Sequence, residues 1–285
     1  MTTELTKSGW TGDAVALSWP ERDIALATMT REGERNSLSL ELIAELSRAL
    51  GEAVEHSARA LILTGVGRAF CAGAHLAYFT KPDERIGEGA FNIRDRYLKR
   101  IADLFDRVEG APIPVIAAIN GYALGGGCEL SLACDFRLMA TGAKIGLPEV
   151  RIGALAGAGG VQKLHRFVGR GKAMEWILLG SHVGHDEAVA HGLAGSLHAP
   201  DELLPAALEL ARRFRSLGPR AVAQSKAALL ACGDIDSRTA RGLGLEALAL
   251  LIGGAEWREG MSAFMEKRSP SFATLAPKTV SKRQA

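Results

Sequence analysis

The sequence predicts an α/β fold over about its first two thirds and a helical region over the remainder. Short apolar strands alternate with amphipathic helices as far as Gly169, beyond which helical periodicity dominates and strand signals nearly vanish. The chain has 285 residues, 47% hydrophobic and 23% charged, which is enough for a large globular core with an appendage. We therefore expect a core domain over residues 1–200 and a helical region over residues 201–285.

Each expected element follows from a local pattern. Short apolar runs bounded by turn residues predict strands at 14–18, 24–29, 60–63, 113–119 and 136–139. Apolar residues at helical spacing predict helices at 37–54, 93–108, 161–167, 172–179, 201–216, 220–231, 238–252 and 255–267. Polar or glycine-containing segments predict a loose N-terminal tail (1–11), a mobile loop (79–92), a loop-and-turn region (141–153) and a basic, disordered tail from Pro277.

The stretch from Ile116 to Glu129, reading IAAINGYALGGGCE, joins a buried strand to a helix through three consecutive glycines. The first turn of a helix carries backbone N–H groups without intrahelical partners, and its dipole favours an anion there. Glycine also lets a ligand oxygen approach the backbone closely. Because Glu129 lies within this first turn, the stretch predicts an oxyanion-binding site with an acid beside it.

Two other interpretations of the glycines remain open. The triplet Gly125–Gly127 is also compatible with a tight turn that packs against a neighbouring helix. The spacing of Gly121 and Gly126 matches a phosphate-binding loop, but Gly127 and Cys128 stand where that loop needs Lys and Ser or Thr. A phosphate cradle is therefore disfavoured.

Glu129 and Glu149 are both acids in apolar surroundings. Glu129 is followed by apolar residues on the predicted helix, and Glu149 lies in the segment Gly146–Val150 beside Pro148. A carboxylate in such surroundings needs a partner, or its pKa rises. One such residue is usually a satisfied buried acid, but two, each near glycine-rich backbone, indicate a pair that handles protons.

Composition and spacing argue against several other classes of protein. The net charge of +2 implies no strongly charged partner, so no nucleic acid is expected, and no apolar run is long enough to span a bilayer. The histidines His182, His185 and His191 lack ligand-like spacing, so we expect no metal site. The four cysteines lack CxxC spacing and the N-terminus lacks a signal pattern, which indicates reduced thiols in a cytoplasmic protein.

Five stretches follow one another along nearly the whole chain: RNSL (35–38), ILTGVGRAFCAGAHL (62–76), PVIAAINGYALGGGCELSLACDFRL (114–138), IGLPEVRIGALAGAGGVQKLHRFVGRGKAME (145–175) and FMEKRSPSF (264–272). In this order they resemble the crotonase superfamily, in particular the enoyl-CoA hydratase/isomerase family. The resemblance implies a crotonase-like spiral of strand–strand–helix repeats. It also implies a C-terminal helical region that builds trimers or dimers of trimers.

The resemblance implies a role for each site residue. The backbone N–H groups of Ala74 and Gly126 would form the oxyanion hole that holds a thioester enolate. Glu149 would deliver a proton to Cα, and Glu129 would activate the water that adds at Cβ. The CoA moiety would lie along the residues that match the family's CoA-binding positions: Arg35, Ser37, Ala72, His75, Leu76, Phe264 and Lys267.

Three positions depart from the family pattern. His75 replaces a common aspartate, Ala77 stands where some members carry a lysine, and Ala156 replaces the usual proline. None of these changes removes either glutamate. The first two bear on the detailed CoA contacts, and the third bears on a loop conformation.

The expected activity is hydration of a 2-enoyl-CoA to a 3-hydroxyacyl-CoA, or the reverse dehydration, with an acyl-CoA substrate and no cofactor beyond its CoA moiety. The alternatives are an enoyl-CoA double-bond isomerase or a dehydratase of a specialised, carnitinyl-type acyl-CoA. Isomerases of the family typically keep only the glutamate that corresponds to Glu149, so the presence of Glu129 favours hydration. Some relatives bind RNA, but the near-balanced charge disfavours that role here.

Overall fold

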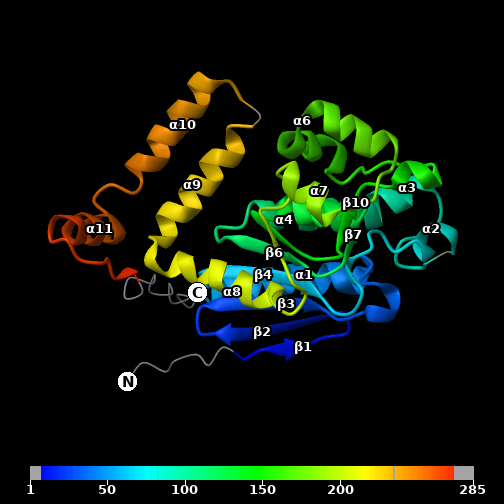
Figure 1. Cartoon of the computed structure of the whole chain (residues 1–285), viewed down its shortest axis with the longest axis horizontal. Helices are drawn as coiled ribbons and strands as arrows, with labels where there is room; N and C mark the ends of the chain where they lie inside the picture. Colours follow the sequence, from blue (N-terminus) through cyan, green and yellow to red (C-terminus); the bar gives the residue numbers. More distant parts are fainter. Residues whose placement is uncertain (1–7, 82, 234, 273–285) are drawn as a thin grey trace, which may run out of the picture. The chain divides into compact units, whose positions relative to one another are not determined.

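The computed structural model describes residues 8–81, 83–233 and 235–272. The chain divides after Ala211 into two compact units (Figure 1). The assignment of the site to residues 1–200 and of self-association to residues 201–285 stays a prediction.

The larger sheet of the first unit has seven strands in the order β1-β2-β3-β4-β6-β8-β11. These strands are β1 (Trp10–Thr11), β2 (Val15–Glu21), β3 (Ile24–Met29), β4 (Ala60–Gly65), β6 (Val115–Ile119), β8 (Phe136–Ala140) and β11 (Ser196–His198). From β3 onward all neighbours in the sheet run parallel. Every residue of β6 is buried, as expected for a parallel strand covered on both faces.

A second sheet has four strands in the order β10-β9-β7-β5. They are β5 (Ala69–Cys71), β7 (Tyr122–Leu124), β9 (Lys144–Gly146) and β10 (Val183–Gly184). Strands β5, β7 and β9 are parallel to one another, and β10 is antiparallel to β9. From β4 to β9 the chain adds strands alternately to the large sheet and to the small sheet, as in the expected strand–strand–helix repeat.

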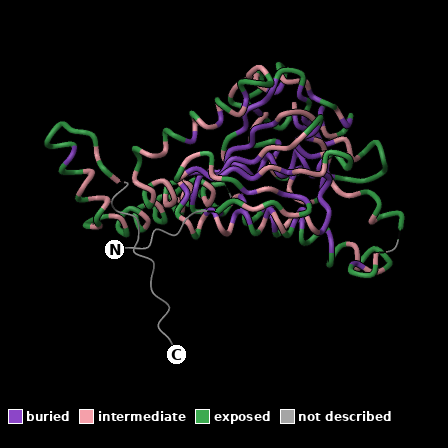
Figure 2. The backbone as a smooth tube through the Cα atoms, turned by 90° about the horizontal axis from the view of Figure 1, so that it is seen from below, coloured by how far each residue is buried: buried purple, intermediate pink, exposed green. Residues whose placement is uncertain are grey.

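Helices form much of the chain that connects these strands. In the first unit they are α1 (Leu40–Glu55), α2 (Ala77–Thr80), α3 (Ala90–Ile93), a π-helical turn (Arg94–Leu98), α4 (Lys99–Glu109), α5 (Gly126–Ala133), α6 (Gly160–Leu178), α7 (His185–Ala190) and α8 (Leu203–Arg212). Helix α1 begins three residues later than the predicted start at residue 37, because the Ser39 side chain caps it by accepting a hydrogen bond from the Leu42 N–H. Figure 2 shows the buried residues concentrated in the middle of this unit.

Three predictions for loops were wrong in part. Trp10 and Thr11 form β1 by pairing with β2, so the predicted tail does not extend to residue 11. Helices α2 and α3 reach into the predicted loop 79–92, and β9 lies in the predicted loop 141–153. A three-residue strand is too short to show a periodicity, and only its partners β7 and β10 identify it. The predicted basic tail lies outside the described residues.

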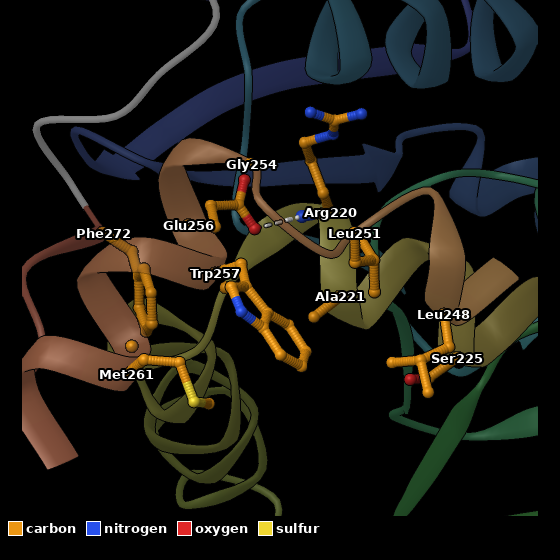
Figure 3. Close-up of a pocket in the computed structure, with 12 residues that line it drawn as sticks. Arg220, Ala221, Ser225, Leu248, Leu251, Gly254, Glu256, Trp257, Met261 and Phe272 are labelled. Carbon is orange, nitrogen blue, oxygen red and sulfur yellow. Dashed lines mark hydrogen bonds between the residues drawn. The ribbon is translucent and has the colours of Figure 1, made fainter. Parts of the chain in front are cut away.

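The second unit is helical, as expected. It contains α9 (Pro219–Ala231), α10 (Ser237–Ala249), α11 (Ala255–Met265) and a 3₁₀ turn (Arg213–Ser216). A cavity of about 350 Å³ lies within it, lined among others by Trp257, Met261 and Phe272 (Figure 3). Among the described residues of this unit only Ala263 is buried, so the helices have almost no core of their own.

The side chain of Arg137, on β8, is hydrogen-bonded to the C-terminal end of α5. Its guanidinium is buried and donates to the carbonyl oxygens of Ser131 (3.0 Å), Cys134 (2.7 Å) and Leu193 (2.8 Å). It also lies over the Phe167 ring, 4.3 Å from the ring centroid. A positive charge at the C-terminus of a helix interacts favourably with the helix dipole. The three carbonyl oxygens are also removed from water, so they need the hydrogen bonds that Arg137 donates. Arg137 therefore holds α5 against the large sheet.

Replacing Arg137 with Met is expected to lower the free energy of unfolding by about 3 kcal/mol, because buried carbonyl oxygens lose their donors. Urea denaturation followed by circular dichroism measures this loss. The matched control is Arg94→Met, at a side chain that is 62% exposed, for which we expect a change below about 0.5 kcal/mol. Equal losses in the two variants would contradict the assigned role of Arg137.

Candidate functional site

The carboxyl ends of β5 and β7 bring two glycine-containing segments into contact. Gly73 and Ala74 follow β5, and Gly125 and Gly126 follow β7. A Cβ placed on Gly73 would lie 3.1 Å from the Gly126 nitrogen, and one placed on Gly126 would lie 3.5 Å from the Ala74 nitrogen. The backbone nitrogens predicted to form an oxyanion hole are therefore neighbours.

Glu149 reaches the same edge from the next strand of the small sheet. It follows β9 and begins a 3₁₀ helix, Glu149–Ile152. Its Oε1 would lie 2.9 Å from a Cβ on Gly125, whose φ of 54° is also unfavourable for other residues. Its Oε2 is buried and has no hydrogen-bond partner among the described residues. An unpartnered buried carboxyl oxygen beside a helix N-terminus is suited to a bound ligand or water.

Glu129 points from α5 towards the start of α6. Its side chain is buried, and Oε1 accepts hydrogen bonds from the backbone N–H groups of Ala158 (2.9 Å) and Gly160 (2.8 Å). Gly160 is the first residue of α6, where N–H groups lack intrahelical partners. One carboxyl oxygen is thus held in place, and Oε2 is left for other contacts.

The pKa values of both glutamates are raised. Burial raises the pKa of Glu129 to about 7, and the charge of Glu149 adds to this effect. The two backbone N–H groups and the positive charge of Lys163 act in the opposite direction on the Glu129 pKa. Burial also raises the pKa of Glu149. Two carboxyls with raised pKa values, beside backbone donors, can exchange protons with a substrate near neutral pH.

The predicted CoA-binding residues of the first unit lie together. Arg35, which adopts the left-handed conformation, accepts a hydrogen bond at its carbonyl oxygen from the Ala72 N–H (3.0 Å). Ser37 Oγ and His75 Nδ1 are hydrogen-bonded at 2.8 Å. Leu76 follows directly and is 57% exposed. The segment that follows β5 and the loop that follows β3 therefore form one surface next to Ala74.

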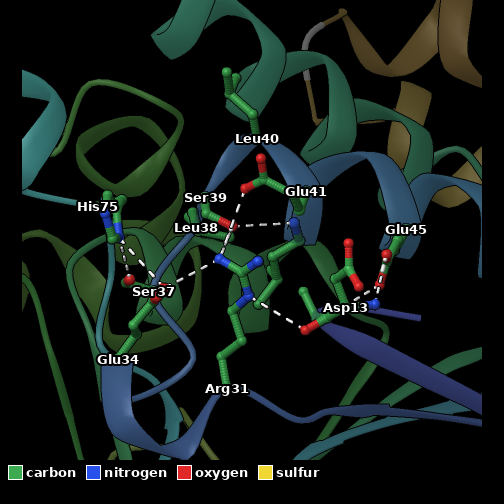
Figure 4. A network of polar contacts seen from close by, with 12 residues as sticks. Asp13, Arg31, Glu34, Ser37, Leu38, Ser39, Leu40, Glu41, Glu45 and His75 are labelled. Atoms are coloured by element: carbon green, nitrogen blue, oxygen red, sulfur yellow. Dashed lines mark hydrogen bonds and ion pairs between the residues drawn. The ribbon is translucent and has the colours of Figure 1, made fainter. Parts of the chain in front are cut away.

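A polar network surrounds the two hydrogen-bonded residues of this surface. Figure 4 shows Ser37, His75 and Glu34 facing one another, with Arg31 and Glu41 nearby. The Glu34 carboxylate lies 3.7 Å from His75 Nδ1. The imidazole that replaces the family's usual aspartate thus has a hydroxyl and a carboxylate as neighbours.

Phe264 and Lys267 belong to the second unit. Phe264 lies near the end of α11 and is 79% exposed, and Lys267 is in the left-handed conformation. Their predicted contact with CoA stays a prediction.

Sequence reasoning did not assign several groups that support the site. The N–H groups of Ala158 and Gly160 hold Glu129, and the glycine-rich run before α6 was their only signal. Lys163 pairs with Glu109 at 3.0 Å, a contact across 54 residues of sequence. Tyr97 lies in the predicted helix 93–108 without a predicted role, although its hydroxyl contacts the segment that bears Ala74.

Within the described part of the chain, no group of three or more His, Cys, Asp or Glu side chains is arranged to hold a metal ion. No helix in that part combines the length and the hydropathy needed to cross a membrane.

Comparison with known proteins identifies the family. Residues 20–274 match the profile of the Enoyl-CoA hydratase/isomerase family. A putative enoyl-CoA hydratase/isomerase, YngF, of Bacillus subtilis is 40% identical over 90% of this chain and 97% of its own. Crotonyl-CoA hydratase of Syntrophomonas wolfei is 36% identical over 88% of this chain and 95% of its own.

The fold agrees with solved structures of the same family. An enoyl-CoA hydratase from Bacillus anthracis superimposes with a TM-score of 0.83 at 38% identity, covering 91% of this chain and 98% of the other. The match to the family extends over residues 20–274 and therefore through both units. The chain belongs to the enoyl-CoA hydratase/isomerase family of the crotonase superfamily.

Proposed function

We propose that the protein adds water to a 2-enoyl-CoA to form a 3-hydroxyacyl-CoA, and catalyses the reverse dehydration. The observation that carries this proposal is a pair of acids, the buried Glu129 and the half-buried Glu149 with its buried Oε2, beside the adjacent backbone nitrogens of Ala74 and Gly126. The names of relatives support it, since they include a crotonyl-CoA hydratase and a short-chain-enoyl-CoA hydratase. The reaction needs no cofactor beyond the CoA moiety of the substrate.

The thioester oxygen binds at the N–H groups of Ala74 and Gly126. Gly126 is the first residue of α5, so its N–H points out of the helix and the helix dipole favours negative charge there. When water adds at Cβ, negative charge moves onto this oxygen. Preorganised donors stabilise that charge as it develops, and each donor is typically worth about 10²–10³ in rate.

The two glutamates divide the proton transfers. Glu129, held at Oε1, takes a proton from water through Oε2, and the hydroxide forms a bond to Cβ. Glu149 gives its proton to Cα as the enolate collapses. A carboxyl with a raised pKa keeps the proton it must donate, and one with a pKa near 7 can accept one at neutral pH.

A different reaction of the same site remains as the alternative. Isomerisation moves one proton between two carbons and needs a single acid, and dehydration of a specialised acyl-CoA of the carnitinyl type needs the same enolate. The engagement of Glu129 by two backbone donors favours hydration, because it orients a second carboxylate towards the site.

We also propose that the chain self-associates to form a trimer or a dimer of trimers. The helices of the second unit expose many apolar side chains, including Leu243, Leu245, Leu248, Leu250, Ile252, Phe264 and Met265. Helices with so small a core need further apolar contacts. We also assign the protein to the cytoplasm, and Phe264 and Lys267 to the CoA-binding surface.

Glu129→Gln and Glu149→Gln are each expected to lower kcat for hydration by about 10²–10⁴, because each removes one proton transfer. Loss of the enoyl absorbance of crotonyl-CoA and of longer enoyl-CoA thioesters measures the rate. The control is Glu175→Gln on the surface of α6, where no change is expected. Hydration that survives Glu129→Gln would refute the role of Glu129, and isomerisation that survives it would favour the alternative reaction.

Lys163→Met is expected to move the acidic limb of the pH profile of kcat/KM to higher pH. The Lys163 charge lowers the pKa of Glu129, so its removal raises that pKa from about 7. Glu129 must be deprotonated to activate water, so activity falls at neutral pH and recovers in more alkaline buffer. Lys172→Met, which removes a cation paired with Glu175 on the same helix, should leave the profile unchanged. A shift of the limb to lower pH would contradict the assignment.

Light scattering is expected to give a particle of three or six chains of 30.2 kDa. The double substitution of Leu245 and Leu250 by Asp should yield smaller particles, because it places charges on side chains that are 62% and 67% exposed in the single chain. Glu246→Gln on the same helix is the control. A monomeric wild-type protein would refute the proposed assembly.

A further inference from the structure

Tyr97 is a buried residue of the segment 77–100, and its hydroxyl contacts the loop that bears Ala74. Tyr97 is the only buried residue between positions 87 and 100, all of which are described. It lies in the π-helical turn Arg94–Leu98, whose other side chains are exposed. Such turns are rare and frequently occur at functional sites.

The Tyr97 hydroxyl bridges two backbone groups on either side of the Leu38–Ala74 contact. Leu38 and Ala74 form an isolated parallel β-bridge, and the Leu38 N–H donates to the Gly73 carbonyl oxygen at 2.8 Å. In a regular parallel pair the His75 N–H would donate to the Leu38 carbonyl oxygen. Here the Tyr97 hydroxyl accepts from the His75 N–H (2.6 Å) and donates to the Leu38 oxygen (2.8 Å).

Both peptide groups that flank Ala74 are therefore tied down. Leu38 holds the Gly73–Ala74 peptide, and the Tyr97 hydroxyl holds the Ala74–His75 peptide. The Ala74 N–H lies in the plane of the Gly73–Ala74 peptide. The Ala74–His75 peptide shares the Ala74 Cα with that plane, so fixing it restricts how far the Gly73–Ala74 peptide can move or rotate. The aromatic ring is itself held, because Tyr78 and Phe79 pack against it with centroids 5.0 Å and 5.8 Å away.

We propose that Tyr97 is a positioning residue that aims the Ala74 N–H at the thioester oxygen by bridging the His75 N–H and the Leu38 carbonyl through its hydroxyl. This inference rests on the proposed function, since it concerns the same oxyanion hole. A donor acts on the transition state only when it is aligned with the oxygen that gains charge. Loss of the bridge therefore lowers the rate of the chemical step without removing the binding surface for the substrate.

The test is Tyr97→Phe, which keeps the ring and removes both hydrogen bonds of the hydroxyl. We expect kcat for crotonyl-CoA hydration to fall by about 10- to 100-fold, less than for loss of a whole donor, with KM changed by less than about threefold. The matched control is Tyr78→Phe. Its hydroxyl accepts from Leu40 N–H and Arg85 and has no contact with the peptides around Ala74. Both rates should be measured after thermal denaturation has shown that the variants are folded.

A spectroscopic measurement separates positioning from a loss of stability. Infrared difference spectra of bound butanoyl-CoA, labelled with ¹³C at the thioester carbonyl, report how strongly the carbonyl is polarised. The wild-type protein and Tyr78→Phe should lower the stretching frequency, and Tyr97→Phe should shift it back towards the value in water. An unchanged frequency and kcat in folded Tyr97→Phe would overturn the proposal while leaving the oxyanion hole intact. No lowering in the wild-type protein would instead refute the proposed function.

If Tyr97→Phe does not fold, 3-fluorotyrosine introduced at position 97 replaces it. Fluorine makes the phenol oxygen a weaker acceptor for the His75 N–H and keeps both contacts. A partial return of the carbonyl frequency towards the value in water supports the inference. An unchanged frequency overturns it.

Discussion

The candidate site depends on the parallel pairing of three short strands, β5, β7 and β9. Parallel strands end at the same edge of a sheet, so the residues that follow them meet even when they are far apart in sequence. That edge collects Ala74, Gly126 and Glu149. Gly125 and Gly73 are required there because a side chain at either position would meet a backbone or carboxyl atom at 2.8–2.9 Å.

The electrostatics of the site follow from what surrounds each acid. Glu129 has lost its water, and two backbone N–H groups at the start of α6 only partly compensate for that loss. Glu149 keeps one buried oxygen without a partner among the described residues. Such groups are costly to a folded protein, which is typical of sites where the missing partner is a substrate. The stable scaffold that tolerates this cost includes the buried Arg137 at the other end of α5.

The two units differ in how many of their apolar side chains are buried within the unit itself. The first has strands whose residues are almost entirely buried, such as β3 and β6. The second has helices with many exposed apolar side chains, and only Ala263 among its described residues is buried. A region of this kind is most simply stabilised by copies of the same chain, which is why we connect it with assembly. The same region carries Phe264 and Lys267, so assembly and CoA binding are proposed for one part of the chain.

The amino-acid sequence alone determined the α/β class, the buried strand at 24–29, most of the strand predicted at 113–119, and the presence of a helix next to the glycine triplet. Apolar runs and consecutive glycines are signals that can be recognised within a short stretch of sequence. Its motifs also singled out both glutamates and both backbone donors. Only the tertiary structure decided that Ala158 and Gly160 hold Glu129, that β9 exists, and that Tyr97 reaches the loop that bears Ala74. Those contacts join residues that are 22 to 31 positions apart, and the pairing of a three-residue strand is likewise non-local. No local sequence pattern encodes contacts between residues so far apart in the chain, because these contacts form only when the sheets assemble.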